Sequence, residues 1–496
     1  MFLGIDLGTS SLKAVVIDEQ GALVGEASSP LERSAPRPRW SEQDPQAWWR
    51  AAQEAVRALP TEVRAGVRGV GLAGQMHGAV LLDDAQAVIR PAILWNDGRA
   101  ADAGATFERR EPASRQIAAN LAMPGFTAPK LIWVAEHEPE VFRRIACVLL
   151  PKDWLRFKLT GDWVSEPSDA SGTLWLDVAA RRWSERLLAA SGLTPAQMPR
   201  LVEGCEISAT LTREAAAALG LRPGIAVAGG GSDNAAGAAG IGVVEDGDAL
   251  LSLGTSGVIF VADSALRADP ERAVHAFCHC VPQRWHRMAV SLSCTATIAF
   301  AARLGGYADE AALLREVAAA RAPHPARLVM LPYLNGERTP HNDAAACGVV
   351  FGLDASTTRT DIGRAALEGV AFALADGLDA LAARGSRVRT LAVIGGGSRS
   401  ALWGRILAAA LDCTLTYPER GDVGPALGAA RLARMAVDGI DTRVALAKPA
   451  TTATIAPDPA LADELAGRRE LFRALYRDLA DRFAVSAGDN LVDAAA

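Results

Sequence analysis

The tetrapeptide Leu-Gly-Thr-Ser occurs twice in this chain, at residues 7–10 and again at 253–256. Each copy stands between two apolar stretches that have the composition of β-strands. The copies lie 253 − 7 = 246 residues apart in a chain of 496, which is the offset expected of a duplicated domain. The pattern therefore predicts two related lobes, each with one strand-turn-strand unit.

Both turns have the composition of phosphate-binding loops. Glycine lets the backbone approach a ligand closely, and the hydroxyl groups of Thr and Ser add donors to a run of backbone N–H groups. Two facing turns would hold opposite ends of a triphosphate. We therefore predict nucleotide contacts at these positions: Gly8, Thr9, Ser10, Gly254, Thr255 and Ser256.

Charge and hydropathy exclude several classes of function. A net charge of −6 gives no general attraction to nucleic acid or to an anionic membrane surface. No apolar stretch approaches the roughly 20 residues that span a bilayer, and the first residues do not resemble a signal peptide. Seven scattered cysteines indicate reduced thiols. We expect a cytoplasmic protein that acts on small molecules, without nucleic-acid or membrane partners.

One group of side chains, between residues 275 and 286, has metal-binding capacity. Its spacing matches no standard zinc pattern, so we expect core thiols on a strand, with a metal site as the alternative. The group comprises His275, Cys278, His279, Cys280 and His286.

Strand-like and helix-like segments alternate along the whole chain, which predicts an α/β fold in two lobes. Strands are expected at 2–7, 12–18, 22–28, 67–73 and 225–229, and core helices at 401–411 and 425–437. A Pro/Thr/Ala-rich segment at 447–460 reads as a linker before a charged amphipathic helix. The predicted units are 1–244, 245–440 and 441–496.

Four loops at strand ends together contain the groups needed for phosphoryl transfer. That reaction needs phosphate-binding turns, a carboxylate near magnesium, and a second carboxylate that accepts the proton of the attacking hydroxyl. Asp6, beside the first turn, is expected to organise Mg²⁺ through water. Asp233 begins a helix whose dipole keeps it ionised as the base. Lys13 either contacts a phosphate or is an exposed strand lysine.

Each loop also has a purely structural interpretation when taken alone. A glycine triplet before a helix is often only a tight connection, and an Asp at a helix start is usually a cap. Met76 and His77 alone would be a core residue and a hydrogen-bonded imidazole. The functional interpretation depends on the loops occurring together.

Seven segments closely resemble the FGGY carbohydrate kinase family, and the resemblance extends from residue 1 to about 480. They are residues 4–11, 75–78, 94–99, 233–237, 252–257, 336–341 and 395–400. The resemblance implies an actin-like, ribonuclease-H-like fold in each lobe, with an ATPase cleft between the lobes. It also implies that the first lobe mainly binds sugar and that the second binds the adenine side of ATP.

The same resemblance implies a reaction and roles for individual residues. Residues 74–78, Gly-Gln-Met-His-Gly, resemble the family members that phosphorylate the terminal hydroxyl of D-xylulose with ATP and Mg²⁺. Asp233 matches the proton acceptor, and Asp6 matches the carboxylate on the magnesium side. The sugar contacts would be Met76, His77, Trp95, Asp233 and Asn234. The adenosine loop would be Gly395, Gly396, Gly397 and Ser398.

Other interpretations stay open at this point. The nearest alternative is another sugar kinase of the same family that acts on ribulose, gluconate or glycerol. A second is a non-catalytic actin-like ATP-binding protein, which would have the two phosphate turns but would not need Asp233 or a sugar loop. Family habit implies a homodimer. One departure from the family is Ser232, where relatives commonly carry glycine. If that position needs a positive φ, serine costs about 1–2 kcal/mol there.

Overall fold

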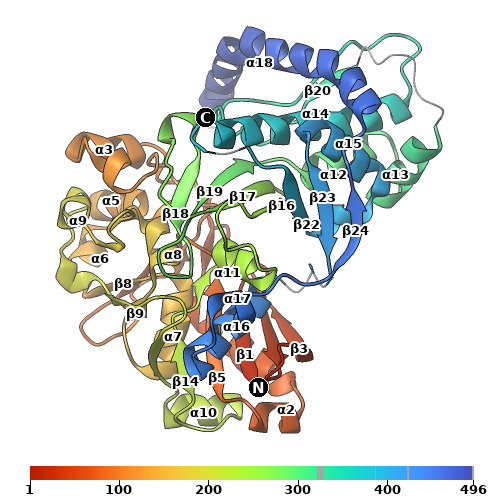
Figure 1. Ribbon diagram of the computed structural model, residues 1–496. Helices are drawn as coiled ribbons and strands as arrows, with labels where there is room; N and C mark the ends of the chain where they lie inside the picture. The colour runs from red at the N-terminus through yellow and green to blue at the C-terminus, as the bar shows by residue number, and fades with distance from the viewer. Residues whose placement is uncertain (321–327, 386, 420, 422–423, 494–496) are drawn as a thin grey trace.

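The computed structural model describes residues 1–493, except 321–327, 386, 420 and 422–423. Figure 1 shows two lobes, with the N-terminus in the lower lobe and the C-terminal helix along the top of the upper lobe. Each lobe is built on one seven-stranded mixed sheet with helices against it, so the α/β prediction is confirmed.

The lower lobe is centred on strand β1 (Phe2–Leu7), which pairs with β2 (Ser11–Ile17) antiparallel and with β5 (Gly69–Gly74) parallel. The sheet order is β13-β14-β5-β1-β2-β3, with β15 paired to β5. The further strands are β3 (Leu23–Pro30), β13 (Ile207–Thr210), β14 (Ala226–Ala228) and β15 (Gly231–Ser232). Helix α1 (Pro45–Ala58) packs on β2 and β3. Asp44 caps this helix and Pro45 is its first residue, both of which favour a helix start.

The upper lobe repeats this arrangement. Strand β16 (Ala249–Leu253) pairs with β17 (Gly257–Asp263) antiparallel and with β22 (Thr390–Ile394) parallel, as β1 does with β2 and β5. The sheet order is β18-β19-β17-β16-β22-β23-β24. The further strands are β18 (His275–Cys278), β19 (Trp285–Ser291), β23 (Thr414–Pro418) and β24 (Thr451–Ile455). The two Leu-Gly-Thr-Ser turns therefore occupy equivalent places, as the duplication predicts.

Short strands and helices complete both lobes. Outside the two sheets, the strands are β4 (Glu42–Gln43), β6 (Val80–Leu82), β7 (Ala92–Ile93), β8 (Cys147–Leu149), β9 (Val164–Ser165), β10 (Leu176–Asp177), β11 (Arg182–Trp183), β12 (Arg200–Leu201), β20 (Val329–Leu331) and β21 (Val349–Phe351). Before residue 241 the helices are α2 (Thr61–Ala65), α3 (Ala103–Arg110), α4 (Ser114–Ile117), α5 (Thr127–His137), α6 (Pro139–Arg143), α7 (Pro151–Thr160), α8 (Pro167–Ala170), α9 (Glu185–Ala190), α10 (Arg213–Leu219) and α11 (Asp233–Gly240). After it they are α12 (Thr295–Leu304), α13 (Glu310–Ala319), α14 (Arg359–Ala382), α15 (Ala401–Leu411), α16 (Pro425–Asp438), α17 (Thr442–Ala445) and α18 (Pro459–Asp493). The 3₁₀ turns among the described residues are η1 (Ser171–Thr173), η2 (Pro195–Gln197), η3 (Pro270–Arg272) and η4 (Gly396–Arg399).

Helix α16 returns from the second half of the sequence to the lower lobe. It packs on β1, β5 and α11, and in Figure 1 its blue ribbon lies among the red and orange strands. Glycine makes the close approach possible, because a Cβ at Gly4, Gly71 or Gly428 would clash with a backbone carbonyl across the contact. The predicted unit 245–440 therefore does not coincide with one lobe at this helix.

The predicted linker at 447–460 contains a strand. Residues Thr451–Ile455 form β24, which pairs with β23 at the edge of the upper sheet. Three Thr and one Ile among five residues favour a strand, and this propensity outweighs the Pro/Ala signal on either side. Helix α18 then packs on α14 and α15, so the segment after 450 belongs to the upper lobe.

The His/Cys group at 275–286 is a buried aromatic and thiol cluster. His286 stacks on Phe260 with ring centroids 4.3 Å apart, and burial holds its pKa well below the usual value. Across the described ranges, no group of three or more His, Cys, Asp or Glu could hold a metal ion. All seven cysteines are free. None of the helices in the described part of the chain has the length and apolar character needed to cross a membrane.

Candidate active site

Three parallel strands of the lower sheet end side by side. Leu7 at the end of β1 and Ser232 at the end of β15 both stand in register with Gly74, the last residue of β5. Ligands bind at the carboxyl ends of parallel strands, where loops diverge. This register brings Asp6, the loop after Gly74 and Asp233 to one edge of the sheet, so the two predicted carboxylates belong to the same lobe.

Asp6 is a buried carboxylate whose surroundings would favour binding of a cation. Its Oδ1 is buried and has no hydrogen-bond partner among the described residues. Burial, and then the charge of Asp233, raise the pKa of Asp6 to about 7, against a smaller lowering by Lys13. Mg²⁺ usually takes one or two carboxylates and completes its shell with phosphate oxygens and water. The donor set at Asp6 fits that cation.

Asp233 is the first residue of α11, and Ser232 caps the helix. The Ser232 hydroxyl accepts from the Ala235 N–H at 3.4 Å, and Ser232 has φ −59°. Ser232 therefore does not have the positive φ that would strain a serine. The left-handed conformation in this turn is adopted by Gly230, with φ +75°. Since Ser232 supplies the cap, the Asp233 carboxylate is left to face the site.

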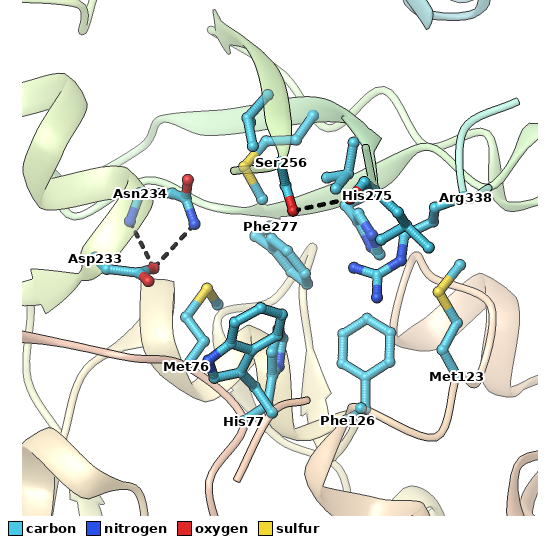
Figure 2. A pocket seen from close by; sticks show the side chains of 16 residues that line it. Met76, His77, Met123, Phe126, Asp233, Asn234, Ser256, His275, Phe277 and Arg338 are labelled. Atoms are coloured by element: carbon cyan, nitrogen blue, oxygen red, sulfur yellow. Dashed lines mark hydrogen bonds between the residues drawn. The ribbon is translucent and has the colours of Figure 1, made fainter. Parts of the chain in front are cut away.

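The Asp233 carboxylate is held by its neighbour in the sequence. Its Oδ1 accepts from the Asn234 backbone N–H at 2.7 Å and from the Asn234 side-chain amide at 2.9 Å (Figure 2). Burial raises the pKa of Asp233 to about 6, and the two hydrogen bonds limit that rise. The carboxylate is therefore mainly ionised at neutral pH and can accept a proton.

A network of buried ion pairs fixes the backbone next to Asp233. The Ser232 N–H donates to the Ser168 hydroxyl at 2.9 Å, and that hydroxyl donates to Glu166 at 2.8 Å. Lys152, fully buried, pairs with three carboxylates at 2.5–3.8 Å: Asp153, Asp169 and Glu166. No sequence motif predicted this network, because its members are scattered over residues 152–169.

A cavity of about 240 Å³ opens beside Asp233. Sixteen residues line it, and half come from each lobe (Figure 2). The predicted sugar residues Met76, His77, Trp95, Asp233 and Asn234 all line it. The upper lobe contributes an aromatic and cationic side that the sequence did not identify: His275, Phe277 and Arg338. The second lobe therefore takes a larger part in this cavity than the resemblance implied.

His77 lies in the cavity in a defined protonation state. Its Nδ1 is 2.7 Å from the Gly172 carbonyl oxygen, and a carbonyl only accepts, so Nδ1 carries the hydrogen. Burial lowers the pKa of His77 to about 3, so the ring is neutral. Its Nε2 is therefore a hydrogen-bond acceptor. His77 has φ +68°, a conformation that non-glycine residues mostly adopt where the surrounding structure imposes it.

Trp95 is presented to the cavity by a rigid loop. Asp97 and Arg99 are buried and pair with each other at 2.7 Å, and Asp97 also accepts from the Ser41 N–H at 2.6 Å. These two residues therefore fix the loop. The Trp95 indole N–H donates to the Thr9 hydroxyl at 3.0 Å, which links the sugar side to the first turn.

Side chains in and beside the first turn make contacts within the lower lobe that the sequence did not predict. The Thr9 hydroxyl donates to Gln75 Oε1 at 3.0 Å, so its hydrogen is already committed within the lower lobe. Lys13 stands opposite Asp6 across β1 and β2, and its ammonium lies 4.0 Å from Glu26. Its side chain is one-third exposed, which agrees with the exposed-strand interpretation of this lysine.

The second turn is divided between two cavities. Gly254 and Thr255 line a larger one, of about 740 Å³, together with Gly396 and Gly397. Ser256 lines the smaller cavity instead, beside Asp233.

Gly395 and Ser398 shape the glycine loop of the larger cavity. The Ser398 hydroxyl donates to the Gly395 carbonyl at 2.7 Å, and Gly395 has φ +89°. Residues 254–256 of the second turn thus line both the smaller cavity beside Asp233 and the larger one in the upper lobe.

The chain matches known proteins over nearly its full length. Models of the N-terminal and C-terminal domains of the FGGY family of carbohydrate kinases match residues 1–240 and 249–437. A xylulose kinase of Escherichia coli (strain K12) is 50% identical over 483 residues, with 97% of this chain and 99% of the relative covered. One of Klebsiella pneumoniae is 48% identical, with 97% and 99% covered.

A solved structure gives the same result for the fold. The crystal structure of a xyloylose kinase from Brucella ovis superposes with a TM-score of 0.92 at 47% identity, covering 96% of this chain and 99% of that one. The predicted architecture, two actin-like lobes of α/β structure, is confirmed.

Proposed function

This chain belongs to the FGGY family of carbohydrate kinases, and we propose that it transfers the terminal phosphoryl group of ATP to the terminal hydroxyl of D-xylulose. The products are D-xylulose 5-phosphate and ADP. The relatives named xylulose kinase support this choice of sugar. The observation that carries the chemistry is the position of Asp233, between a pentose-sized cavity and the strand edge that contains Asp6.

Asp233 is the general base in this proposal. With a pKa of about 6 its carboxylate is mostly ionised at neutral pH, and it lines the cavity where the sugar binds. The carboxylate accepts the proton of the terminal hydroxyl as that oxygen bonds to the γ-phosphorus. The bond between the γ-phosphorus and the oxygen bridging to the β-phosphate breaks, and its electron pair leaves with ADP.

The sugar is oriented by side chains of the lower lobe. The lone pair of His77 Nε2 accepts a hydrogen bond from a sugar hydroxyl, because Nδ1 is committed to Gly172. Met76 and the Trp95 ring provide apolar contact with the carbon chain, and the Asn234 amide holds Asp233 in place. Orienting the hydroxyl at the base lowers the entropic part of the barrier.

The nucleotide is held between the two turns. The 740 Å³ cavity accommodates the adenosine part at Gly396 and Gly397, and Gly254 and Thr255 lead from it toward Asp233. Gly8 and Ser10 would hold the outer phosphates, and Asp6, with its buried and unpartnered Oδ1, would hold Mg²⁺ through water. When bound, the cation neutralises the charge that develops on the phosphate oxygens.

Substrate profiling tests the proposed sugar. Release of ADP is followed with D-xylulose, D-ribulose, D-gluconate and glycerol at matched concentrations. The proposal expects the highest kcat/KM for D-xylulose. A preference for one of the others would assign the chain to a different sugar within the family. ATP turnover that no sugar stimulates would favour the non-catalytic actin-like alternative.

Two further predictions concern location and assembly. Seven free cysteines, five of them buried, fit a reducing compartment, and this supports a cytoplasmic enzyme. A homodimer remains a prediction, and sedimentation of the purified protein would test it.

A further inference from the structure

Arg338 stands on a loop that is anchored to the upper sheet. The buried carboxylate of Glu337 accepts from the Leu292 N–H at 2.9 Å and from the Ser291 hydroxyl at 2.7 Å. On the other side, the Thr339 N–H donates to the Val290 carbonyl at 3.1 Å, and the Val290 N–H donates to the Thr339 hydroxyl at 3.1 Å. Both neighbours of Arg338 are thus fixed to β19 and its end.

The guanidinium of Arg338 has no internal partner. Within the described ranges it makes no ion pair or side-chain hydrogen bond, although Arg338 lines the cavity beside Asp233. Figure 2 shows it pointing into the cavity between Phe126 and His275, with Asp233 at the far end of the view. The neighbouring His275 ring is neutral and adds no second positive charge, because burial holds the pKa of His275 well below the usual value. Burial lowers the pKa of Arg338, and the charge of the adjacent Glu337 only partly opposes this effect. A buried guanidinium without a hydrogen-bonded acceptor is stabilised when a ligand supplies one.

The chemistry of the proposed substrate supplies that acceptor. A 2-ketopentose closes its furanose ring through its terminal hydroxyl oxygen, so the open-chain keto form is the one that offers that hydroxyl for phosphorylation. In this form a carbonyl oxygen lies near the end of the molecule remote from the reacting hydroxyl. A carbonyl oxygen only accepts hydrogen bonds, and a guanidinium only donates them.

We propose that Arg338 binds the carbonyl oxygen of the open-chain sugar and makes the enzyme selective for 2-ketoses over the corresponding polyols. The inference rests on the proposed function and names the side chain that recognises the carbonyl end of the substrate, remote from the reacting hydroxyl. The two ends of the sugar are then held by opposite lobes, with Asp233 in the lower lobe and Arg338 in the upper. Of the other side chains at the remote end, Phe126, Phe277 and Met123 are apolar, and the neutral ring of His275 has a single uncharged N–H, so Arg338 is the one charged donor among the described lining residues.

The test compares D-xylulose with the two pentitols that reduction of its carbonyl gives, xylitol and D-arabinitol. Steady-state kinetics give kcat/KM for D-xylulose. The pentitols are measured as competitive inhibitors, which requires no turnover of them. The variants are Arg338→Met, which keeps much of the side-chain length without donors, and Arg338→Lys, which keeps a charged donor. The exposed Arg182→Met is the matched control.

The proposal expects Arg338→Met to lower kcat/KM for D-xylulose by about 10- to 100-fold, the scale of a lost charged hydrogen bond. The inhibition constants of both pentitols should change by less than about 3-fold, and Arg338→Lys should recover part of the loss. Arg182→Met should match the wild type. Equal weakening of ketose and pentitols in Arg338→Met or Arg338→Lys would overturn the proposal.

The wild-type protein separates this inference from the proposed function. If it phosphorylates D-xylulose but binds the pentitols equally well, the inference about Arg338 is wrong and the function stands. If it does not phosphorylate D-xylulose, the proposed function fails, and the role of Arg338 in reading this ketose fails with it.

Discussion

The imidazole of His77 and the backbone of Gly172 are in direct contact, with Nδ1 and the carbonyl oxygen 2.7 Å apart. A Cβ on Gly172 would lie 2.6 Å from that nitrogen and 2.8 Å from the terminal methyl of Met76. The single 3₁₀ turn η1 therefore sets the positions of His77 and Met76, two of the side chains proposed to contact the sugar. Residues 76 and 172 are far apart in the sequence, so only the fold reveals this dependence.

Gly172→Ala should damage sugar binding selectively. The added methyl group displaces His77 and Met76, and misplacing positioning groups by about 1 Å can cost up to about 10²-fold in rate. We expect kcat/KM for D-xylulose to fall by about 10- to 100-fold, with the Kd for ATP unchanged. Gly467→Ala is the control, because a Cβ there meets nothing within 4 Å. Wild-type kinetics in Gly172→Ala would show that the contact does not position the sugar residues.

The pH dependence of kcat/KM should reflect the carboxylates at the strand edge. The pKa of Asp233 is raised to about 6 and that of Asp6 to about 7, and both groups are proposed to act in the ionised form. Activity should therefore be full above these values and fall as the pH drops through about 7 and then about 6. A rate that stays constant down to about pH 5 would contradict this assignment.

Asn234→Ala should move that profile in a predictable direction. The side-chain amide donates to the ionised carboxylate of Asp233 at 2.9 Å and so favours the charged form. Losing this donor should raise the pKa of Asp233, by about one unit if the hydrogen bond is worth about 1.5 kcal/mol. The acidic limb of the profile then shifts to higher pH. A shift to lower pH would mean that the amide acts elsewhere.

Asp6→Asn should change the requirement for magnesium. Replacing the carboxylate with a neutral amide removes a negative charge from the proposed cation site. The Mg²⁺ concentration that gives half-maximal rate should rise by about 10- to 100-fold, the usual effect of altering a group around a bound metal. Glu26→Gln, on strand β3, which is separated from β1 by β2, removes the same charge at an exposed position and serves as the control. An unchanged magnesium requirement in Asp6→Asn would rule out this role.

Gly428→Ala should destabilise the lower lobe. Its methyl group would clash with the backbone carbonyl of Ala236 in α11, so α16 and α11 must separate. Overpacking of this kind costs about 1–3 kcal/mol in the free energy of unfolding. Thermal unfolding of Gly428→Ala should occur at a lower Tm than that of the wild type, whereas Gly467→Ala should leave it nearly unchanged. Equal Tm values would show that the helix contact tolerates a Cβ.

Much of the fold follows from local sequence signals. The duplicated turn and the strand patterns around it predict two related α/β lobes, each with a strand-turn-strand unit, because strand propensity and tight turns are local properties. The return of α16 to the lower lobe had no such signal. It depends on glycines at residues 4, 71 and 428, which are far apart in the chain and meet only when the helix crosses the sheet.

The candidate site likewise contains residues that the sequence predicted and residues that only the structure identified. The predicted residues around Asp233 all line one cavity. Met76, His77, Asp233 and Asn234 do so because they follow strands β5 and β15, which end at the same edge, whereas Trp95 comes from the loop after β7. Gly172, the Lys152 network and Arg338 were not given roles from the sequence. Their parts depend on a carbonyl direction, on buried charge pairs and on an unpaired guanidinium, and these are properties of tertiary packing. The Thr9 hydroxyl shows the reverse case, since Gln75 takes the hydrogen that was expected for phosphate.

The central claim is that the Asp233 carboxylate removes the proton from the sugar hydroxyl. The most direct measurement is kcat for D-xylulose in Asp233→Ala, together with the Kd for ATP of the same protein. We predict that kcat falls by about 10²–10⁴-fold, the scale of a lost general base, while ATP binds as tightly as in the wild type. Turnover close to the wild-type value, with ATP still bound, would contradict the account.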